Sequence, residues 1–221
     1  MEGRAGKTES REKTETQTTR ERIVGTALRL FSEKGYGAVS VRDIAGAVGI
    51  RESSLYYHFK NKQDIFDTIV ACCFERAEAY FRACGLPFAQ GDDVSMYQDA
   101  GPERLEELLF STFGYFFEDP WNVRFRRLLV VNQYENERAE EIYRSLYRDY
   151  PLAFQSRLFA GLMERGEFRK TDPDTAALEF YGPVFLLLHT CDGLEEAKEP
   201  LRNHIRQFAG LYRIFREEET R

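Results

Sequence analysis

The sequence predicts an all-α protein divided into two helical domains, and three observations carry this prediction. Apolar side chains recur at spacings of three and four residues along most of the chain, and no segment shows the alternation typical of a strand. Three prolines, Pro102, Pro120 and Pro173, each follow a glycine or an aspartate, which is the arrangement of a helix start. A chain of 221 residues with 43% hydrophobic and 31% charged side chains is long and apolar enough to bury a sizeable core.

The chain is expected to have three parts. Residues 1–17 contain almost no large apolar side chains and mix both charge signs, so we interpret them as a flexible tail. Residues 18–63 form the first domain, and its opening helix is expected to start at Thr18 because Thr18 and Glu21 fit a capping box. Residues 64–221 form a larger helical domain.

The stretch from Ser40 to Lys62 predicts two short helices joined by a tight turn. Ser40 is placed as an N-cap, and Asp43 lies in the first turn, where the helix dipole favours an anion. Gly49 is free to adopt a positive φ, which ends the first helix and turns the chain. The second helix is expected from about Arg51 to Phe59.

The outward face of that second helix carries side chains suited to DNA. Leu55 and Phe59 share the buried face at helical spacing, whereas small hydroxyls, aromatics and a histidine point away. A helix-turn-helix with such an outward face is built to enter a major groove. The candidate DNA-binding residues are Arg42, Glu52, Ser53, Ser54, Tyr56, Tyr57, His58, Lys60 and Lys62.

Four motifs occur at fixed spacing between Thr19 and Phe66: LFxxxGY at the end of the first helix, IAxxxGI at the helix crossing, LYYHF in the second short helix, and K-x-K before the fourth. Together they resemble the N-terminal domain of the TetR family of bacterial transcriptional regulators. The remainder of the chain resembles the family only in its helical architecture. The resemblance implies a three-helix, helix-turn-helix DNA-binding domain followed by a larger helical ligand-binding and dimerisation domain. It also implies that Tyr56, Tyr57 and His58 lie against the DNA backbone.

Each candidate at the start of the two short helices has a role and a plainer alternative. Arg42 is suited to a bidentate grip on guanine or on a phosphate, and the alternative is an ordinary surface arginine. Glu52 either complements the helix N-terminus, which we favour, or accepts a hydrogen bond from a cytosine amino group. Ser53 and Ser54 are small enough to allow close approach and to donate to phosphates or base edges.

The tyrosines and Lys62 are assigned to the phosphate backbone. Tyr56 and Tyr57 cannot both face one core from adjacent helical positions, so at least one is exposed and available for a phosphate or sugar. Ordinary packing is the alternative for the other. Lys62 lies in a helix's first turn, where a cation opposes the dipole, and phosphate binding would offset that cost. A merely solvated lysine is the alternative.

The charge distribution is compatible with DNA although the whole chain carries a net charge of −6. From Arg20 to Lys62 there are eight Lys and Arg against four Asp and Glu, which gives +4 and leaves −10 for the remainder. Attraction to phosphates decays within about 8 Å at physiological salt. A basic first domain on an acidic second domain is therefore able to bind DNA.

The larger domain is predicted to be helical throughout. Asn61 is expected to cap a helix that runs to about Ala83, and residues 85–101 are expected to form a loop. A helical segment at 137–165 is interrupted only at Pro151, which predicts either a kinked helix or two stacked helices.

The last two helices are expected to form a dimer interface. Residues 176–188 are almost continuously apolar and predict a helix buried on most sides, and the last helix is expected at about 200–215. Together they carry more hydrophobic surface than one small domain needs, so we expect them to pair with their copies in a homodimer. Leu188 and Phe208 are expected to lie in that interface.

Aromatic side chains in the larger domain are dense enough to line an apolar cavity for a small-molecule effector. Core packing is the alternative for any single one of them. The candidates are Phe113, Phe116, Phe117, Trp121, Tyr150 and Phe154.

Several classes of protein are disfavoured. None of the motifs H-E-x-x-H, G-x-S-x-G or G-x-x-x-x-G-K-[ST] occurs, so we expect no enzyme and no cofactor. His189 and Cys191 are two residues apart and do not share a helical face, so we interpret them as core residues and expect no metal. No apolar run reaches membrane-spanning length and no N-terminal signal segment is present, so a cytoplasmic protein with reduced cysteines is expected.

These observations predict a ligand-responsive DNA-binding transcriptional regulator. The expected partners are a near-palindromic double-stranded operator, a second copy of the chain, and a small, mostly apolar effector that releases the repressor. The alternative is a constitutive or architectural DNA-binding protein without an effector. An effector must favour one spacing of the two DNA-binding domains of the dimer over another, because equal affinity for both would leave DNA binding unchanged. The two hypotheses therefore differ in whether a small molecule changes the affinity for DNA.

Overall fold

The computed structural model describes residues 5–86, 94, 97 and 102–214, with side chains from residue 19 onward except 102–105. The prediction of an all-α protein is confirmed, because the only extended pairing among the described residues is a single bridge between Phe168 and Arg213. The elements are α1 (Ala5–Lys34), α2 (Val41–Val48), α3 (Glu52–His58), α4 (Lys62–Ala83), α6 (Pro102–Glu118), α7 (Pro120–Asn132), α8 (Glu137–Arg144), the π-helical turn η1 (Ser145–Asp149), α9 (Tyr150–Glu164), α10 (Pro173–Thr190) and α11 (Leu194–Tyr212).

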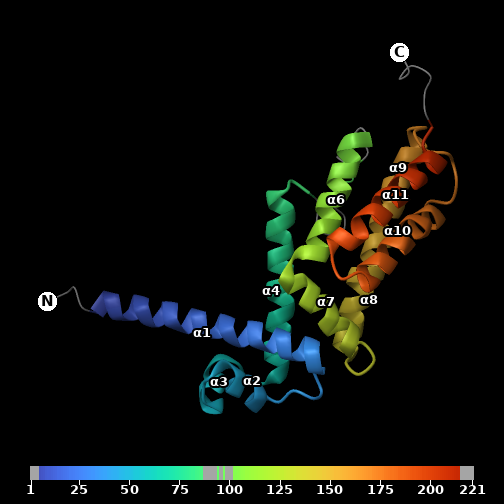
Figure 1. Ribbon diagram of the computed structural model, residues 1–221. Helices are drawn as coiled ribbons and strands as arrows, with labels where there is room; N and C mark the ends of the chain where they lie inside the picture. Colours follow the sequence, from blue (N-terminus) through green and yellow to red (C-terminus); the bar gives the residue numbers. More distant parts are fainter. Residues whose placement is uncertain (1–4, 87–93, 95–96, 98–101, 215–221) are drawn as a thin grey trace. The chain divides into compact units, whose positions relative to one another are not determined.

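The chain separates into two compact units (Figure 1). The first unit contains the chain up to Arg76 together with Arg124–Glu140, and the second contains Ala77–Val123 and the chain from Glu141 onward. The first unit is therefore larger than the domain expected at residues 18–63, because it includes most of α4 and the end of α7.

The first unit is built around the side chains that the helical spacing marked as apolar. The stripe of α1 is fully buried, and so are the apolar residues of α2, α3 and the start of α4 that pack with it. The core members are Ile23, Ala27, Phe31, Ile44, Leu55, Phe59, Ile65 and Phe66. Burial of these side chains, each favourable by roughly 1.5–3 kcal/mol for a large residue, holds α2 and α3, which are too short to be stable alone.

The first helix begins much earlier than predicted. The structure has α1 from Ala5, so residues 5–17 are helical and the capping box expected at Thr18 does not start a helix. The reason is composition: this stretch is rich in Glu, Lys, Arg and Gln, which have high helix propensity, and it contains no proline. A helix nucleated by the buried part of α1 extends through such a sequence at little cost.

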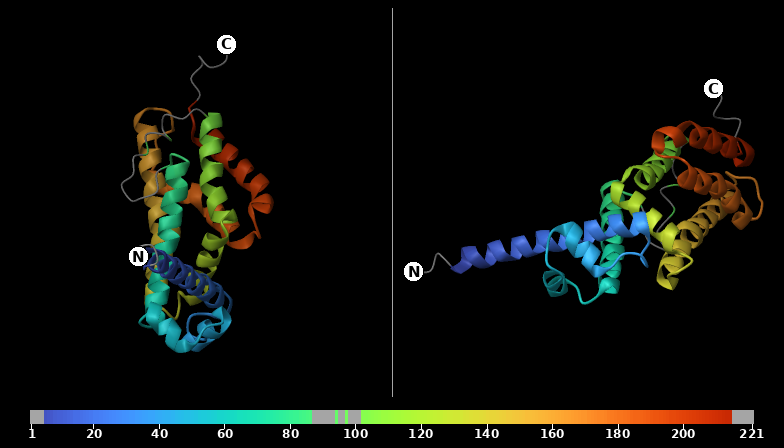
Figure 2. Two further views of the ribbon diagram at one scale, coloured as in Figure 1. Left: turned by 90° about the vertical axis from the view of Figure 1, so that its left-hand side faces the viewer. Right: turned by 60° about the horizontal axis from the view of Figure 1, so that its bottom comes forward.

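The second unit has an aromatic core. α9 packs along α10, α10 along α11, and α11 against α6 (Figure 2). The ring of Phe180 lies 5.6 Å from Phe159 and 5.0 Å from Phe208, and Phe159 lies 5.7 Å from Phe168. Edge-to-face and offset contacts of this kind add to the burial of large apolar surface. Phe208, expected at a dimer interface, is a central residue of this core instead.

The interruption near Pro151 takes a form that was not foreseen. The break is the π-helical turn η1, in which the N–H of Tyr150 donates to the carbonyl of Ser145. Pro151 has no N–H and its ring clashes with a carbonyl one turn earlier, and a wider π turn relieves both problems without ending the helix. α8, η1 and α9 therefore follow one another without a loop.

The start of the last helix was predicted wrongly. α11 begins at Leu194, so Pro200 lies inside the helix rather than at its first position. Glu195 and Glu196 in the first turn complement the helix dipole, and the Glu196 side chain accepts from the N–H of Asp192 at 2.8 Å. These interactions favour the earlier start.

The expected loop at 85–101 lies mostly outside the described residues, as does Phe215. The other starts are confirmed: Asp119 and Asp172 accept from main-chain N–H groups at the beginnings of α7 and α10, each at 2.8 Å. No helix in the described part of the chain has the length and apolar character needed to cross a membrane.

Two glycines of the α2 region are expected to respond oppositely to alanine. Gly49 has φ +79°, where a side chain is strained, so Gly49→Ala should lower the free energy of unfolding by about 1 kcal/mol. Gly46 lies inside α2, where no atom lies within 4 Å of an added Cβ, so Gly46→Ala should raise it by roughly 0.5–1 kcal/mol. Urea unfolding of both variants measures the difference. Equal effects would contradict the left-handed turn.

Candidate nucleic-acid interface

The first helix of the motif starts at the predicted N-cap Ser40, and Asp43 completes a capping box that the sequence analysis did not identify. The Ser40 hydroxyl accepts from the N–H of Asp43 at 3.1 Å, and the Asp43 carboxylate accepts from the N–H of Ser40 at 2.8 Å. Hydrogen bonds from the side chain and main chain of Ser40 hold the pKa of the Asp43 carboxyl below its ordinary value. The charge is therefore retained at neutral pH beside the positive end of the helix dipole.

The turn between the two short helices is made at Gly49. The N–H groups of Gly49 and Ile50 both donate to the Ala45 carbonyl at 3.0 Å, which is a Schellman-type closure of α2. The Arg22 guanidinium of α1 donates to the Val48 carbonyl at 2.6 Å. Sequence reasoning missed Arg22, because no local pattern marks a partner that lies 26 residues away. The end of α2 is thus tied to α1.

The exposed face of α3 agrees with the helical-spacing argument. Leu55 and Phe59 are buried, Ser53 and Ser54 are exposed, and Tyr56 and Tyr57 are 50% and 82% exposed. Both tyrosines thus point to solvent, where the sequence required only one to do so.

His58 completes this face at the end of α3. It is half-buried, and its ring lies 5.4 Å from that of Tyr57 in an edge-to-face arrangement. Aromatic side chains gathered on one exposed face are typical of a surface that binds a partner.

Arg42 and Glu52 lie together, which the sequence did not predict. The Arg42 Nε atom is 3.4 Å from a Glu52 carboxylate oxygen, and both side chains are open to solvent. An exposed pair of this kind contributes at most about 1 kcal/mol, so it can open when a stronger acceptor such as a phosphate or guanine is offered. The pair places Arg42 of α2 beside the start of α3.

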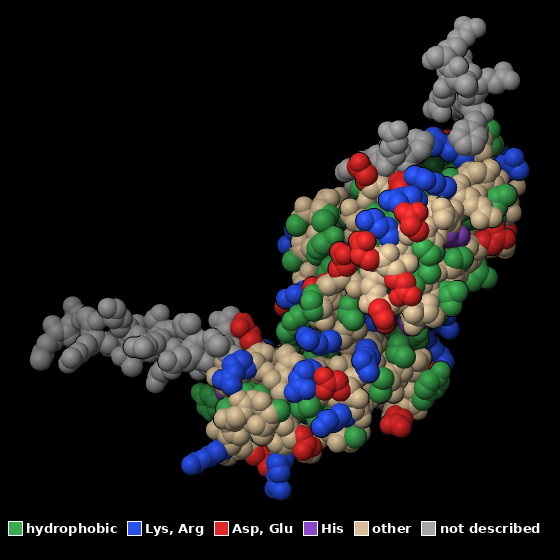
Figure 3. Space-filling view, in the orientation of Figure 1, with side chains coloured by type: hydrophobic (Ala, Val, Ile, Leu, Met, Phe, Trp, Pro, Cys, Tyr) green, Lys and Arg blue, Asp and Glu red, His purple; other side chains and the backbone are tan. Residues whose placement is uncertain are grey.

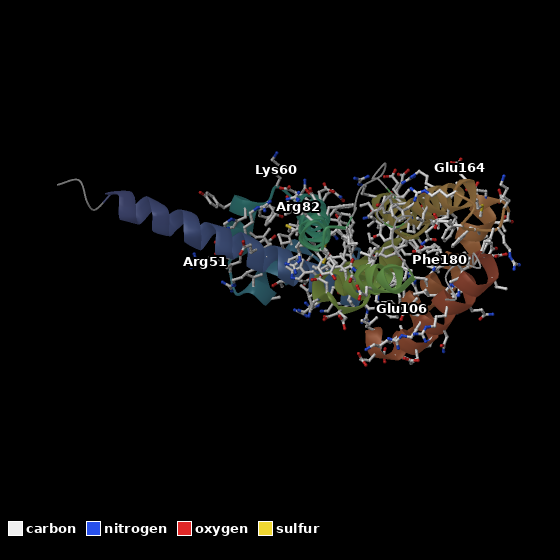
Figure 4. All side chains as sticks on the ribbon, turned by 90° about the horizontal axis from the view of Figure 1, so that it is seen from above. Arg51, Lys60, Arg82, Glu106, Glu164 and Phe180 are labelled. Atoms are coloured by element: carbon white, nitrogen blue, oxygen red, sulfur yellow. The ribbon has the colours of Figure 1, made fainter. Side chains whose placement is uncertain are left out.

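The two lysines that follow α3 have different surroundings. Lys60 is exposed and extends away from the ribbon in Figure 4. The Lys62 ammonium instead donates to the carbonyls of Tyr36 and Val39 at 2.7 and 2.9 Å, and it lies 4.2 Å from the centre of the Tyr36 ring. Burial lowers the pKa of Lys62 below its ordinary value.

The sequence-based interpretation of Lys62 must therefore be revised. The alternative of a merely solvated lysine is wrong, because two main-chain carbonyls and an aromatic face surround the charge. These acceptors offset the unfavourable position of a cation in the first turn of α4, which is the cost that a phosphate was expected to offset. A phosphate contact through its remaining N–H stays a prediction.

The effector candidates are spread over the aromatic part of the second unit. Phe113 and Phe117 are buried on α6, whereas Phe116 and Trp121 are half-buried. Phe116 lies 6.5 Å from Tyr147, a buried residue of η1 that the sequence did not single out.

Tyr150 and Phe154 are neighbours on α9, with ring centres 6.2 Å apart. Phe154 also lies 5.5 Å from buried Tyr97. The structure thus joins these two candidates to each other and to Tyr97.

Two polar side chains of the second unit differ in their hydrogen bonding. His189 is fully engaged: its Nδ1 lies 2.8 Å from the Phe185 carbonyl and its Nε2 lies 3.1 Å from the Tyr143 hydroxyl. Gln155 of α9 is 8% exposed, and its Oε1 accepts no hydrogen bond from any residue that the structure describes. A buried unpaired amide oxygen costs about 1–3 kcal/mol, so it needs an explanation. No group of three or more His, Cys, Asp or Glu gathers as a metal site among the described residues.

A capped short helix, a left-handed glycine turn and a second helix with an exposed polar and aromatic face define a helix-turn-helix protein. Residues 23–69 match the sequence model of bacterial regulatory proteins of the tetR family. This match covers the helix-turn-helix part of the chain, which is therefore similar to the DNA-binding region of that family.

One curated relative is IcaR of Staphylococcus aureus (strain Newman), a helix-turn-helix negative transcriptional regulator of the biofilm operon icaADBC. It is 46% identical over 56 residues, which are 25% of this chain and 30% of IcaR. The likeness thus spans less than a third of that relative's length and is confined to one part of it.

Solved structures extend the likeness of the fold to most of the chain. PfmR, a TetR family regulator from Thermus thermophilus, has a TM-score of 0.61 and 23% identity over 89% of this chain and 97% of its own. The SmeT–triclosan complex has a TM-score of 0.58 and 19% identity over 89% of this chain and 92% of its own. The second unit thus has the helical fold of this family, although its sequence has diverged.

We expect substitutions on the exposed face of α3 to weaken binding to all duplexes alike. Tyr57→Ala should reduce affinity for random and selected duplexes by the same factor, because a phosphate or sugar contact carries no sequence information. Lys60→Ala should do the same and should also reduce the slope of log affinity against log salt by about 1. Fluorescence anisotropy with two duplexes at several salt concentrations measures both effects.

Tyr134 supplies the control, because it is 90% exposed in the first unit but lies outside the motif. Tyr134→Ala should bind as the wild type does. A Tyr57→Ala protein that changed its preferred sequence would show that Tyr57 reads bases.

Proposed function

We propose that this protein is a homodimeric transcriptional repressor that binds a near-palindromic operator and is released by a small, mostly apolar effector. The observation that carries the proposal is the exposed face of α3, where two tyrosines, two serines and a following lysine stand open to solvent. The likeness of 56 residues to the negative regulator IcaR supports the repressor role. Members of this family are regulatory proteins and not enzymes, and we place this one in the cytoplasm with the DNA it would bind.

Charge supports DNA as the partner. Lys and Arg side chains project from the lower end of the first unit in Figure 3, where α2 and α3 lie, while the chain as a whole is acidic. Arg42, Arg51 and Lys60 are all exposed there. Phosphate contacts from such groups position a helix-turn-helix, and the serines and Arg42 are then close enough to read base edges.

A second copy of the chain is proposed to cover the outer faces of α10 and α11. Leu178 and Leu186 are 60% and 59% exposed on α10, with exposed Gly182 between them at helical spacing. On the neighbouring α11, the exposed positions 200, 203, 207 and 211 are Pro, Asn, Gln and Leu, which form an uncharged stripe. Two adjacent uncharged helix faces suit pairing with their own copies about a two-fold axis.

The residues first chosen for this interface need correction. Leu188 and Phe208 are buried inside one chain, so changing them would damage the core rather than the interface. Leu178, Leu186 and Leu211 take their place, because they lie on the opposite sides of the same helices. The interface prediction stays with α10 and α11 but moves to their outward faces.

Dimerisation is expected to determine what kind of DNA site is recognised. Wild-type protein should be a dimer and should select an inverted repeat from random duplexes, because two recognition helices related by a dyad read two half-sites. Leu186→Glu should give a folded monomer, since that side chain is exposed within one chain. The monomer should bind weakly and return no inverted repeat.

Light scattering and selection from random duplexes measure these two outcomes, and Tyr134→Glu is the control for adding a charge at an exposed position. A wild-type protein that is monomeric at micromolar concentration would contradict the proposed dimer. Selection by a wild-type dimer that returned no inverted repeat would contradict the operator assignment.

The second unit is proposed to bind the effector. Its aromatic side chains offer an apolar surface, and the unpaired Oε1 of buried Gln155 is suited to accept from an O–H or N–H group of a ligand. The π-helical turn η1 ends six residues before Gln155, and such turns are common at functional sites. SmeT, which shares the fold, is known as a complex with triclosan. The effector is thus proposed to be an aromatic or apolar molecule with one hydrogen-bond donor.

An effector must bind more weakly when DNA is bound. We expect a compound that raises the Tm, with triclosan as the first probe of a small aromatic library, to lose affinity in the presence of the selected duplex. The coupling should be about 1–3 kcal/mol, and the compound should weaken DNA binding by the same factor, because linkage is reciprocal. Calorimetric titration with and without duplex measures both factors.

Gln155→Leu is the matched variant. It should abolish the calorimetric signal of the compound while leaving the affinity for the duplex unchanged. Equal affinity of the compound in both wild-type titrations would favour the alternative, a constitutive DNA-binding protein without an effector.

A further inference from the structure

The main chain of Tyr36 is held from both sides by side chains of two other helices. Its N–H donates to the Oδ1 atom of Asn132 at 2.6 Å, and its carbonyl accepts from the Lys62 ammonium at 2.7 Å. Lys62 also donates to the carbonyl of Val39 at 2.9 Å. The segment held in this way immediately precedes the DNA-binding motif.

Asn132 is fixed in its orientation. It is 1% exposed, and its Nδ2 atom donates to the Leu128 carbonyl at 2.6 Å. The amide oxygen is therefore left to face the N–H of Tyr36, and the amide cannot flip without losing both bonds. The buried side chain therefore donates to its own helix and accepts from a segment distant in sequence, and it acts as a fixed tether between the two.

The tethered segment determines where α2 begins. It runs from Gly35, which ends α1 with φ +87°, to Ser40, the N-cap of α2. The Tyr36 ring lies 5.1 Å from Phe31 and 5.5 Å from Phe66, and its hydroxyl donates to Gln63 at 3.1 Å. Any shift of Tyr36 would therefore move the start of α2, and with it the turn to α3.

The two tethers come from helices that run between the units. Lys62 is the first residue of α4, whose last turn belongs to the second unit. Asn132 is the last residue of α7, whose first turn belongs to the second unit. The first residue of α4 and the last residue of α7 thus both bind the main chain of Tyr36.

We propose that Asn132 is a positioning residue for DNA binding: together with Lys62 it fixes Tyr36, and thereby holds α2 and α3 in the arrangement that binds a duplex. The proposal rests on the proposed DNA-binding function. It makes Tyr36 the point at which α4 and α7 both act on the helix-turn-helix. Asn132 itself contacts no DNA, because it is buried.

The test compares Asn132→Ala with Asn122→Ala. Asn122 is a matched control because it is also a buried asparagine of α7, but it lies in the second unit and donates to the Phe116 carbonyl at 3.3 Å. Both variants should lower the Tm. Only Asn132→Ala should weaken binding to the selected duplex, by roughly tenfold, when measured well below the Tm.

A double-mutant cycle separates positioning from general damage. Lys62→Met alone should also weaken duplex binding, and combining it with Asn132→Ala should cost less than the product of the two single effects, because both residues hold one segment. Unchanged affinity of Asn132→Ala, or equal losses in both asparagine variants, would overturn the proposal.

Amide hydrogen exchange gives a readout that needs no DNA. In Asn132→Ala, exchange should become faster at the amides of residues 39–49, whereas Asn122→Ala should leave them as in the wild type. If the wild-type protein bound no duplex, the proposed function would fail by itself, and exchange would still decide whether Asn132 holds this segment. Wild-type exchange at 39–49 in Asn132→Ala would overturn the proposal.

Discussion

The left-handed turn at Gly49 is the constraint on which the DNA-binding arrangement depends. Two successive N–H groups share the Ala45 carbonyl there, and the chain reverses within three residues. Because the turn is so short, Leu55 of α3 has to pack into the same core as Ile44 of α2. The opposite face of α3 is thereby forced outward, and Tyr57 stands in solvent as a consequence of a turn eight residues earlier.

Local signals in the sequence were sufficient to predict several helix starts and one turn. The N-cap Ser40, the turn residue Gly49 and the helix caps Asp119 and Asp172 all lie within a few residues of the feature they predict. The predicted start of α11 was wrong. Pro200 was interpreted as the first helical residue, although the acidic residues before it favour an earlier helix start. The early start of α1 at Ala5 was missed because residues 5–17 have high helix propensity but no large apolar side chains to mark a helix by their spacing.

Long-range partners could not be predicted. The carbonyls that bind Lys62 lie 23 and 26 residues away, and Asn132 lies 96 residues from Tyr36. Which apolar residues of α10 face inward also depends on α9 and α11, so the sequence did not reveal that Leu188 is buried and Leu186 is exposed. The sequence gives no sign that the Oε1 atom of Gln155 is buried without a hydrogen-bond partner among the described residues, because this depends on which residues surround it in the fold.

The two units divide the chemistry in a way that suits regulation. The first unit exposes Tyr56 and Tyr57 beside basic side chains, whereas the second has an aromatic core and exposes Leu178 and Leu186 on α10. α4, α7 and α8 each contribute residues to both units, so these helices connect the two units along the chain. This arrangement needs no contact between effector and DNA.

The central claim is that the outward face of α3 meets DNA. The most direct test is an amide chemical-shift titration of the isotope-labelled protein with a duplex that contains an inverted repeat. Our account predicts the largest shift changes in α2, α3 and the residues up to Lys60, with the side-chain signals of Tyr56 and Tyr57 among them. Shift changes confined to the second unit, with α3 unaffected, would contradict it.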